Sequence, residues 1–209
     1  MKKVILLGIA GVILFSSTAA LAQESSDKKI NANWGGLDFG FVSTNSSDEW
    51  GNKILQSSSF GLNVVEYKLP IFKQYIGLTT GLGFNFRTIA FQNQYAMVST
   101  DSTISLQTGN PTLYDSLASI KYSTFNQGFV QVPLLLDFST KTRQAKSFSI
   151  AAGVIGGLRM YAFHQLRGKY SNGDKFNNQM RNDKFYHSNL FNLDATVRIG
   201  YGAIGVFGT

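Results

Sequence analysis

Strict alternation of large apolar residues with small or polar ones is the feature that most constrains the fold of this chain. Between Tyr75 and Gln92 the sequence reads YIGLTTGLGFNFRTIAFQ. The large apolar side chains share one set of alternate positions: Ile76, Leu78, Leu82, Phe84 and Phe86. Small, polar or charged residues share the other set: Gly77, Thr79, Gly81, Gly83, Asn85 and Arg87. Successive side chains of a strand point to opposite faces, so this period predicts a β-strand with one apolar and one polar face.

The same period recurs in six further segments of the chain. They are Trp34–Val42, Phe60–Phe72, Phe129–Phe138, Phe148–Phe163, Phe191–Tyr201 and the closing AIGVFGT from Ala203 to Thr209. We assign one apolar face in the fifth strand to these residues: Phe148, Ile150, Ala152, Val154, Leu158, Met160 and Ala162. Arg159 and Tyr161 then fall on the opposite face. The sequence therefore predicts an all-β chain of seven visible antiparallel strands.

A helical interpretation of one segment has to be considered. Gly153 and Gly157 form a GxxxG spacing inside an apolar run, which can mark packed membrane helices. The run is interrupted by Arg159 and is too short to span a bilayer as a helix. The strand interpretation accounts for more of its residues.

The connections between these strands alternate in length. Long, polar connections cover Ser43–Ser59, Asn93–Thr124 and Gly168–Lys184, and short ones cover Pro70–Gln74, Ser139–Lys146 and Gly200–Ala203. An up-and-down sheet with its long loops at one end and its short turns at the other is typical of outer-membrane β-barrels.

Aromatic residues gather near both ends of the predicted strands. At the short-turn end we expect an interface girdle of Trp34, Phe72, Tyr75, Phe138, Phe148 and Tyr201. At the long-loop end we expect a second girdle of Phe41, Phe60, Phe91, Tyr95, Phe125, Phe129, Phe163, Phe185 and Tyr186. Aromatic belts at both bilayer interfaces are characteristic of membrane barrels.

Alternation alone does not distinguish a membrane barrel from a soluble one, whose apolar side chains point inward. Glycines on the polar face favour the membrane case, because small residues suit the crowded interior of a narrow barrel. At about eight strands such an interior is filled by side chains, so an open pore is not expected. Because buried charges have to be paired, we expect the charged residues of this face to form a structural network. They are Asp38, Glu66, Arg87, Asp137, Arg159, Asp194 and Arg198.

The N-terminus resembles a secretory signal peptide. A basic MKK precedes the apolar run Val4–Phe15, and Ala20 and Ala22 supply small residues for cleavage after Ala22. We therefore expect three regions: a cleaved signal peptide over 1–22, a short extension over 23–33 and a barrel domain over 34–209. Without Lys2 and Lys3 the formal charge falls from +7 to +5 (17 − 12). The chain has no cysteine, which excludes a disulfide scaffold and a lipid-anchored lipoprotein.

The strand count carries a further expectation. Single-chain bacterial barrels have even numbers of strands, and seven are visible here. We expect an eight-stranded barrel of which this chain is a fragment that lacks the last loop and strand.

Three segments together resemble a known family. FVQVPLLLDF (129–138), IAAGVIGGLRM (150–160) and TVRIGYGAIGVFGT (196–209) are similar to the PorT-like outer-membrane β-barrel family of Gram-negative bacteria. The resemblance runs from about Trp34 to the end of the chain. It implies a barrel in the outer membrane and a further closing strand, and it implies no catalytic residues.

No motif indicates an enzyme, a cofactor or a metal. His164 and His187 fall near Ser171, Asp183 and Ser188 at the long-loop end, and we expect solvated histidines at the rim. A small barrel enzyme acting on lipid and a soluble periplasmic ligand-binding β-barrel remain as alternatives. The expected partners are the lipid bilayer, the export channel, the barrel assembly machinery and an envelope partner reached through the long loops. Nucleic acid is not expected for an exported chain.

Overall fold

The computed structural model describes residues 34–43, 52–73, 75–91, 95–99, 104–108, 117–140, 147–170, 172–180 and 189–209. The predicted signal peptide, its cleavage residues Ala20 and Ala22 and the 23–33 extension lie outside these ranges. Within them, no helix has the length and apolar character needed to cross a bilayer.

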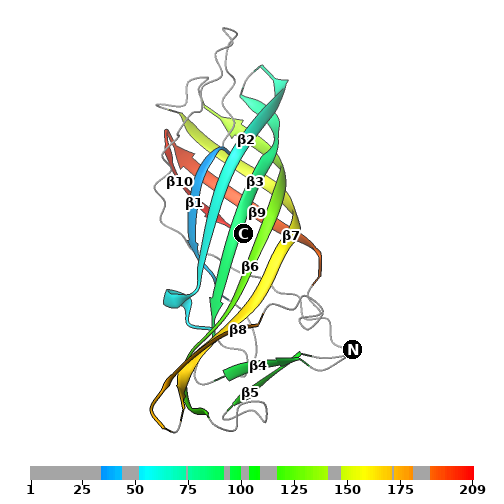
Figure 1. The fold of residues 1–209 in the computed structure, drawn as a ribbon. Coiled ribbons are helices and arrows are strands. Elements are labelled where there is room, and N and C mark those ends of the chain that lie inside the picture. The colour runs from blue at the N-terminus through cyan, green and yellow to red at the C-terminus, as the bar shows by residue number, and fades with distance from the viewer. Residues whose placement is uncertain are drawn as a thin grey trace.

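Seven strands form one antiparallel, up-and-down sheet (Figure 1). In sheet order they are β1 (Gly36–Phe41), β2 (Ser58–Phe72), β3 (Ile76–Ala90), β6 (Leu117–Ser139), β7 (Phe148–Tyr170), β9 (Phe191–Tyr201) and β10 (Ile204–Gly208). A single 3-10 turn, η2 (Ile54–Gln56), precedes β2. The all-β class and the seven predicted strands are confirmed in their predicted order.

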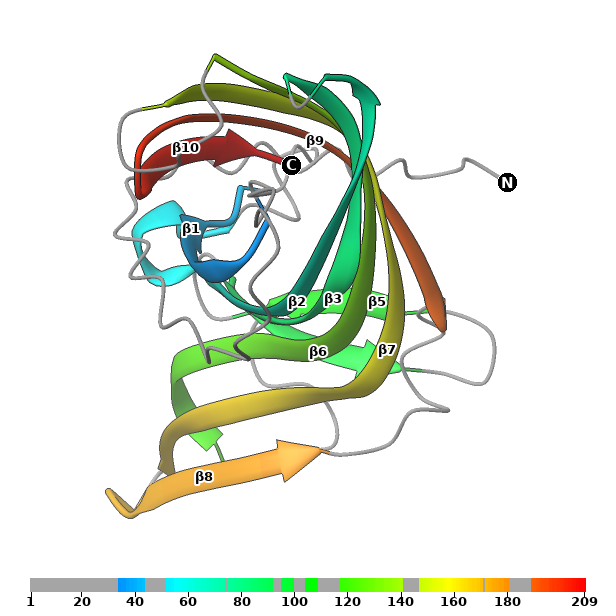
Figure 2. The same ribbon diagram turned by 90° about the horizontal axis from the view of Figure 1, so that it is seen from above.

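The sheet curls around a common axis into an incomplete barrel (Figure 2). Its two edge strands, β1 and β10, form no backbone pairs with each other in the described residues, so the sheet is not closed. Six antiparallel pairings separate them, and the two strands therefore run in the same direction.

Two of the predicted long connections contain strands of their own. β4 (Tyr95–Ser99) and β5 (Ile104–Thr108) form a hairpin, and β8 (Lys175–Met180) pairs with β7. β6 and β7 are each 23 residues long, more than twice the 9–11 or so that a membrane strand needs. The prediction that Asn93–Thr124 and Gly168–Lys184 are loops is wrong in these parts. β8 (KFNNQM) is mostly polar and lacks the apolar alternation that marks a strand against lipid, while the backbone pairing continues from β7.

The overrunning ends form a three-stranded continuation of the sheet, which we call the β6–β7–β8 extension (residues 117–123, 164–170 and 175–180). The ladder between β3 and β6 ends at Ala90 and Thr124, and one further backbone hydrogen bond joins Phe91 N–H to Ser123 O. Beyond it, the ladder partner of β6 is β7. Viewed along the barrel, the extension reaches sideways beyond the ring of barrel strands (Figure 2).

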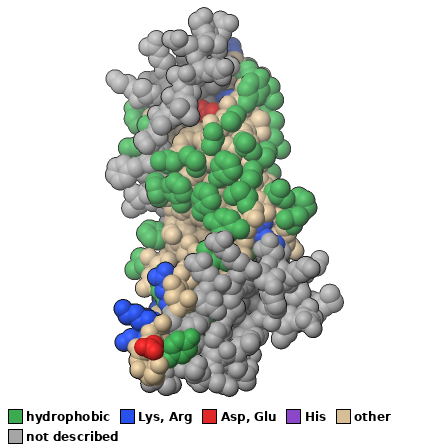
Figure 3. Space-filling model, viewed as in Figure 1, with side chains coloured by type: hydrophobic (Ala, Val, Ile, Leu, Met, Phe, Trp, Pro, Cys, Tyr) green, Lys and Arg blue, Asp and Glu red, His purple; other side chains and the backbone are tan. Residues whose placement is uncertain are grey.

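Burial along the barrel strands is inverted relative to a water-soluble protein. On β6, Val132, Leu134 and Leu136 are 50–55% exposed, whereas Gln131 and Asp137 on the other face are 4% and 0% exposed. Exposed apolar side chains form a broad band across the middle of the face seen in Figure 3. The outer face therefore suits an apolar surrounding.

The height of this band can be estimated from β3. Ile76 and Phe86 both face outward and lie ten residues apart (86 − 76 = 10). At about 3.3 Å per residue they are roughly 33 Å apart along the strand. For a tilt of about 40° this corresponds to roughly 25 Å along the axis, the height of the apolar band of outer-membrane barrels.

A β-bulge changes the facing of residues on β7. The register pairs Phe129 with Arg159 and Gly128 with Tyr161, which leaves Met160 as an extra residue. Beyond it Tyr161 faces outward at 37% exposure and Ala162 faces inward at 3%. The predicted faces of Tyr161 and Ala162 are therefore wrong, because a bulge shifts the period by one residue.

Candidate functional site

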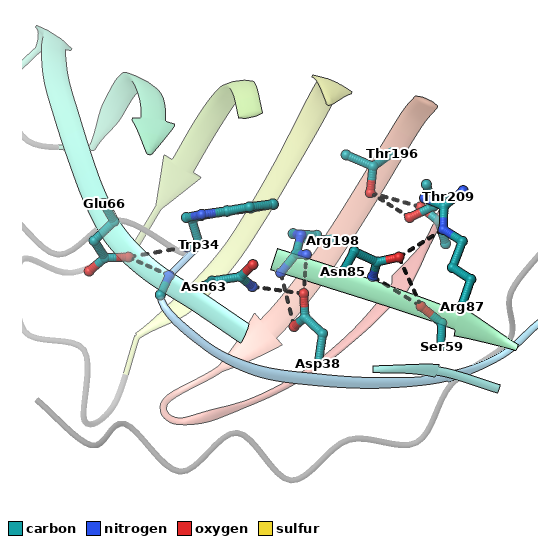
Figure 4. Close-up of polar contacts among 12 residues, drawn as sticks. Trp34, Asp38, Ser59, Asn63, Glu66, Asn85, Arg87, Thr196, Arg198 and Thr209 are labelled. Atoms are coloured by element: carbon teal, nitrogen blue, oxygen red, sulfur yellow. Dashed lines mark hydrogen bonds and ion pairs between the residues drawn. The ribbon is translucent and has the colours of Figure 1, made fainter. Parts of the chain in front are cut away.

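The polar inner face of the sheet is the candidate site, and two ion pairs span it. Figure 4 shows one of them, between Asp38 and Arg198. Asp38 on β1 pairs with Arg198 on β9, and Arg87 on β3 pairs with Asp194 on β9. The first pair crosses the gap at the open edge of the sheet.

Amide side chains add hydrogen bonds to both pairs, although Arg198 Nε has no hydrogen-bond partner among the described residues. Asn63 Nδ2 donates to Asp38 Oδ2 at 2.8 Å, and Asn192 Nδ2 donates to Asp194 Oδ2 at 2.8 Å. Arg87 Nε donates to Asn85 Oδ1 at 2.8 Å. Hydrogen bonds of this kind satisfy the lone pairs and protons that an ion pair leaves over when it is taken out of water.

A third ion pair lies nearer the short-turn end and is fully buried. Lys68 Nζ donates to Asp137 Oδ1 at 2.5 Å and to Ser139 Oγ at 3.1 Å, and both charged side chains are 0% exposed. Lys68 was absent from the predicted charged set. Its position two residues after Glu66 places it on the same face of β2, which is the signal that could have found it.

The segment before β1 turns into the barrel. Glu66 Oε2 accepts hydrogen bonds from the backbone N–H groups of Trp34 and Gly35, at 3.3 and 2.6 Å. Gly36 follows at φ 127°, a conformation that favours glycine. This turn separates Trp34 from the alternation of β1.

Trp34 is 1% exposed, so the prediction that it belongs to the interface girdle is wrong. Its ring lies over Gly81 and Gly83 on β3, where side chains would collide with it. The Arg198 guanidinium lies 4.6 Å from the centre of the Trp34 ring system and 5.1 Å from that of Phe207. Space above two glycines and a cation–π contact favour the inner position.

The seven charged residues predicted for the inner face therefore have different kinds of partner. Four of them form two ion pairs, Asp137 pairs with Lys68, and Glu66 binds backbone N–H groups. Arg159 lies outside these three ion pairs. Its backbone N–H donates to Leu190 O at 2.9 Å.

The other five predicted girdle residues at the short-turn end face outward. They are Phe72, Tyr75, Phe138, Phe148 and Tyr201, all between 39% and 63% exposed.

An aromatic row crosses the outer face near the long-loop end. Ring centres lie 5.0 Å apart in Phe39–Phe60, 6.2 Å in Phe60–Phe86, 6.5 Å in Phe86–Tyr161 and 5.8 Å in Tyr161–Phe163. The Tyr161 ring covers Gly128, which leaves no room there for another side chain. The row follows the cross-strand neighbours on the outer face, where aromatic pairs stabilise a sheet.

Part of the predicted long-loop girdle is wrong. Phe91, Phe125 and Phe129 are 7%, 8% and 4% exposed and pack on the inner side. Phe91 and Phe125 belong to a core cluster with Ile89 and Ala162, and the Arg87 guanidinium lies 5.2 Å from the Phe129 ring centre. The side chains of Tyr95, Phe185 and Tyr186 lie outside the described residues.

His164 lies beyond the aromatic row and is 0% exposed, so the prediction of a solvated rim histidine is wrong for it. Its Nε2 is 2.9 Å from Ser123 Oγ, and its Nδ1 has no hydrogen-bond partner. Burial lowers the pKa of His164 from 6.5 to about 4. His187, Ser171, Asp183 and Ser188 lie outside the described residues.

Within the described ranges, no three carboxylates or histidines group into a candidate metal site. In the comparison with protein families, the family described as outer membrane protein beta-barrel domain matches residues 21–208. Neither the curated proteins nor the solved structures contain a match to this chain.

Proposed function

The chain belongs to the outer membrane protein β-barrel domain family, and we propose that it is a non-enzymatic barrel with a filled interior. In this proposal the barrel anchors the long-loop side at the cell surface, where it has a structural or accessory role in the envelope. The finer kinship we propose is with PorT-like barrels, on the strength of the segments 129–138, 150–160 and 196–209.

The observation that carries the proposal is the inverted burial of the strands. Leu134 and Leu136 are half exposed on the outer face, while Asp137 and Lys68 are fully buried on the inner face. Such a chain is unfavourable in water and favourable in a bilayer, where the outer face contacts hydrocarbon.

The filled interior is supported by the side chains that cross it. Trp34 lies between Arg198 and the glycines of β3, and the Asp38–Arg198 and Arg87–Asp194 pairs cross between strands on opposite sides of the curved sheet. These groups occupy the path that an open channel would need. We therefore propose that solutes do not pass through the barrel.

The Ser123–His164 contact supports a structural role over a catalytic one. A serine and a histidine at 2.9 Å have the spacing of a nucleophile and its base. Ser123 and His164 are 3% and 0% exposed, so a lipid or peptide substrate has no access to either side chain.

Fractionation and conductance together test this function. We expect the full chain to remain with outer membranes after a carbonate wash and to migrate faster on unheated than on heated gels, as folded barrels do. Reconstituted in planar bilayers, it is expected to give no steady single-channel conductance. Recovery in the soluble periplasmic fraction would overturn the membrane assignment, and stable channels would overturn the filled interior.

A further inference from the structure

We propose that the outer face of the β6–β7–β8 extension binds the phosphate groups of the outer-leaflet lipid. This inference rests on the proposed function, because it takes the long-loop end to lie outside the cell. It adds a lipid-binding surface to a barrel otherwise described only as an anchor.

The surface is defined by three basic side chains. Arg167, Lys169 and Lys175 are all exposed, and alternation along β7 puts Arg167 and Lys169 on the outer face with Tyr161 and Phe163. Lys175 on β8 is the direct cross-strand partner of Lys169. Basic side chains are visible at this end of the molecule in Figure 3.

The arrangement is electrostatically unfavourable in isolation. Like charges directly opposite each other on neighbouring strands repel. The three strand segments of the extension carry four basic residues, with Lys121 the fourth, and no acidic one. In the described part of the chain, none of the four forms an ion pair.

In the described part of the chain, the carboxylate in the turn between β7 and β8 forms no ion pair with either lysine. Asp174 lies in the turn between β7 and β8, where its Oδ2 accepts a hydrogen bond from Asn172 Nδ2 at 2.7 Å. Its backbone N–H in turn donates to Asn172 Oδ1 at 3.0 Å. An external anion that bridges Lys169 and Lys175 would relieve their repulsion.

The position of the surface identifies the anion. Arg167 lies six residues beyond Tyr161 (167 − 161 = 6) on the outer face of β7. The outer face changes from the aromatic row to Thr88, Asn126 and Gln165 and then to Arg167, as expected where a strand leaves the hydrocarbon core.

Because the extension leans outward from the barrel, its outer face turns toward the membrane. The extension reaches sideways beyond the ring of barrel strands (Figure 2). When a sheet leans away from the barrel axis, its outer face turns toward the plane of the membrane. Arg167, Lys169 and Lys175 are then held above the headgroups, where Arg and Lys bind phosphate strongly.

Lipid titrations of matched variants test the proposal. The full chain in uncharged detergent is titrated with diphosphoryl lipid A, with a phosphate-free glycolipid of the same acylation, and with inorganic phosphate. Lys169→Gln with Lys175→Gln removes the opposed pair. Lys53→Gln with Lys73→Gln removes the same charge from positions outside the extension.

We expect lipid A to bind the K169Q/K175Q variant roughly ten- to thirty-fold more weakly than wild type, since each basic residue near an anionic surface contributes a factor of about five. The K53Q/K73Q variant is expected to change affinity less than about two-fold. Equal affinities for the two variants, or equal binding of the phosphate-free glycolipid, would overturn the proposal. If inorganic phosphate binds as tightly as lipid A, the claim that the bound phosphate belongs to a lipid would be overturned.

Folding is checked separately by the heat-dependent gel shift, and the single variant K175Q replaces the double variant if the latter does not fold. Failure of wild type to insert into membranes would contradict the proposed function. Normal insertion with no preference for phosphorylated lipid would contradict the lipid-binding surface alone.

Discussion

The outer and inner faces of each barrel strand carry contrasting kinds of side chain. On β3 the outer face carries Leu82, Phe84 and Phe86, whereas the inner face carries Gly81, Gly83 and Arg87. The outer face is tolerant in shape, because lipid adapts to it, but it excludes charge. The inner face accepts charge, but each group there needs a partner and a defined space. The following substitutions test this contrast, from the largest expected effect to the smallest.

Removing one charge from the buried inner pair should have the largest effect. Asp137→Leu leaves the Lys68 ammonium buried without its carboxylate, which costs about 3–5 kcal/mol of unfolding free energy. Urea unfolding in detergent micelles measures this loss. Asp137→Leu combined with Lys68→Met is the control, and it should recover most of the stability. A double variant as unstable as the single one would contradict the pairing.

Adding a charge to the outer face should cost somewhat less. Leu134 lies near the middle of the apolar band, where an arginine facing hydrocarbon costs about 2–4 kcal/mol. Leu134→Arg should therefore lower the fraction of protein that folds into phospholipid vesicles. Leu134→Ala shortens the side chain without charge and should fold nearly as well as wild type. Unimpaired folding of Leu134→Arg would place this face in water.

Acid should loosen the extension through His164. Its pKa is about 4 in the fold and 6.5 when exposed, so the open state binds the proton more readily. Stability is therefore complete above pH 6.5 and falls between pH 6.5 and 4, by up to about 3 kcal/mol for local opening. Hydrogen exchange of β6, β7 and β8 at pH 7 and pH 4 measures it.

His164→Gln removes the titrating group and keeps a donor for Ser123 Oγ. After correction for intrinsic exchange rates, its protection in the extension should not change over this range. An acid-induced loss as large as that of wild type would assign the effect to another group.

The aromatic row should show the smallest effect. Tyr161→Ala removes the contact with Phe86 and uncovers Gly128, which costs about 1 kcal/mol. Tyr161→Phe keeps the ring and should retain wild-type stability in the same urea titration. If both variants lose the same unfolding free energy, the stabilisation comes from the Tyr161 hydroxyl and not from its ring.

Strands that face lipid could be predicted from the sequence, because their alternation reflects two contrasting surroundings. β9 was predicted with the bounds that the structure shows, Phe191–Tyr201. β8 and the far ends of β6 and β7 were not, because these mostly polar segments show no sustained apolar alternation. Backbone pairing with β7 forms β8, and pairing leaves no periodic signature in the side chains.

The sequence predicts which residues face the inside of the barrel better than it predicts their partners there. Alternation along each strand identified the residues of two inner ion pairs. It could not show which residues of different strands pair with each other. Met160 shows how one bulge residue reverses every later assignment on a strand. Trp34 was misplaced because its position depends on Glu66, Arg198 and two glycines that are distant in sequence.

The most direct test of the inverted barrel is spin labelling along one strand. The chain has no cysteine, so single cysteines can be placed at Leu134, Leu136, Gln131 and Asn126 without background. Labels on folded protein in vesicles report collisions with oxygen, which concentrates in lipid, and with a water-soluble nickel complex. We predict high oxygen and low nickel accessibility at Leu134 and Leu136, low values of both at Gln131, and nickel accessibility at Asn126. High nickel accessibility at Leu134 and Leu136 would contradict the account.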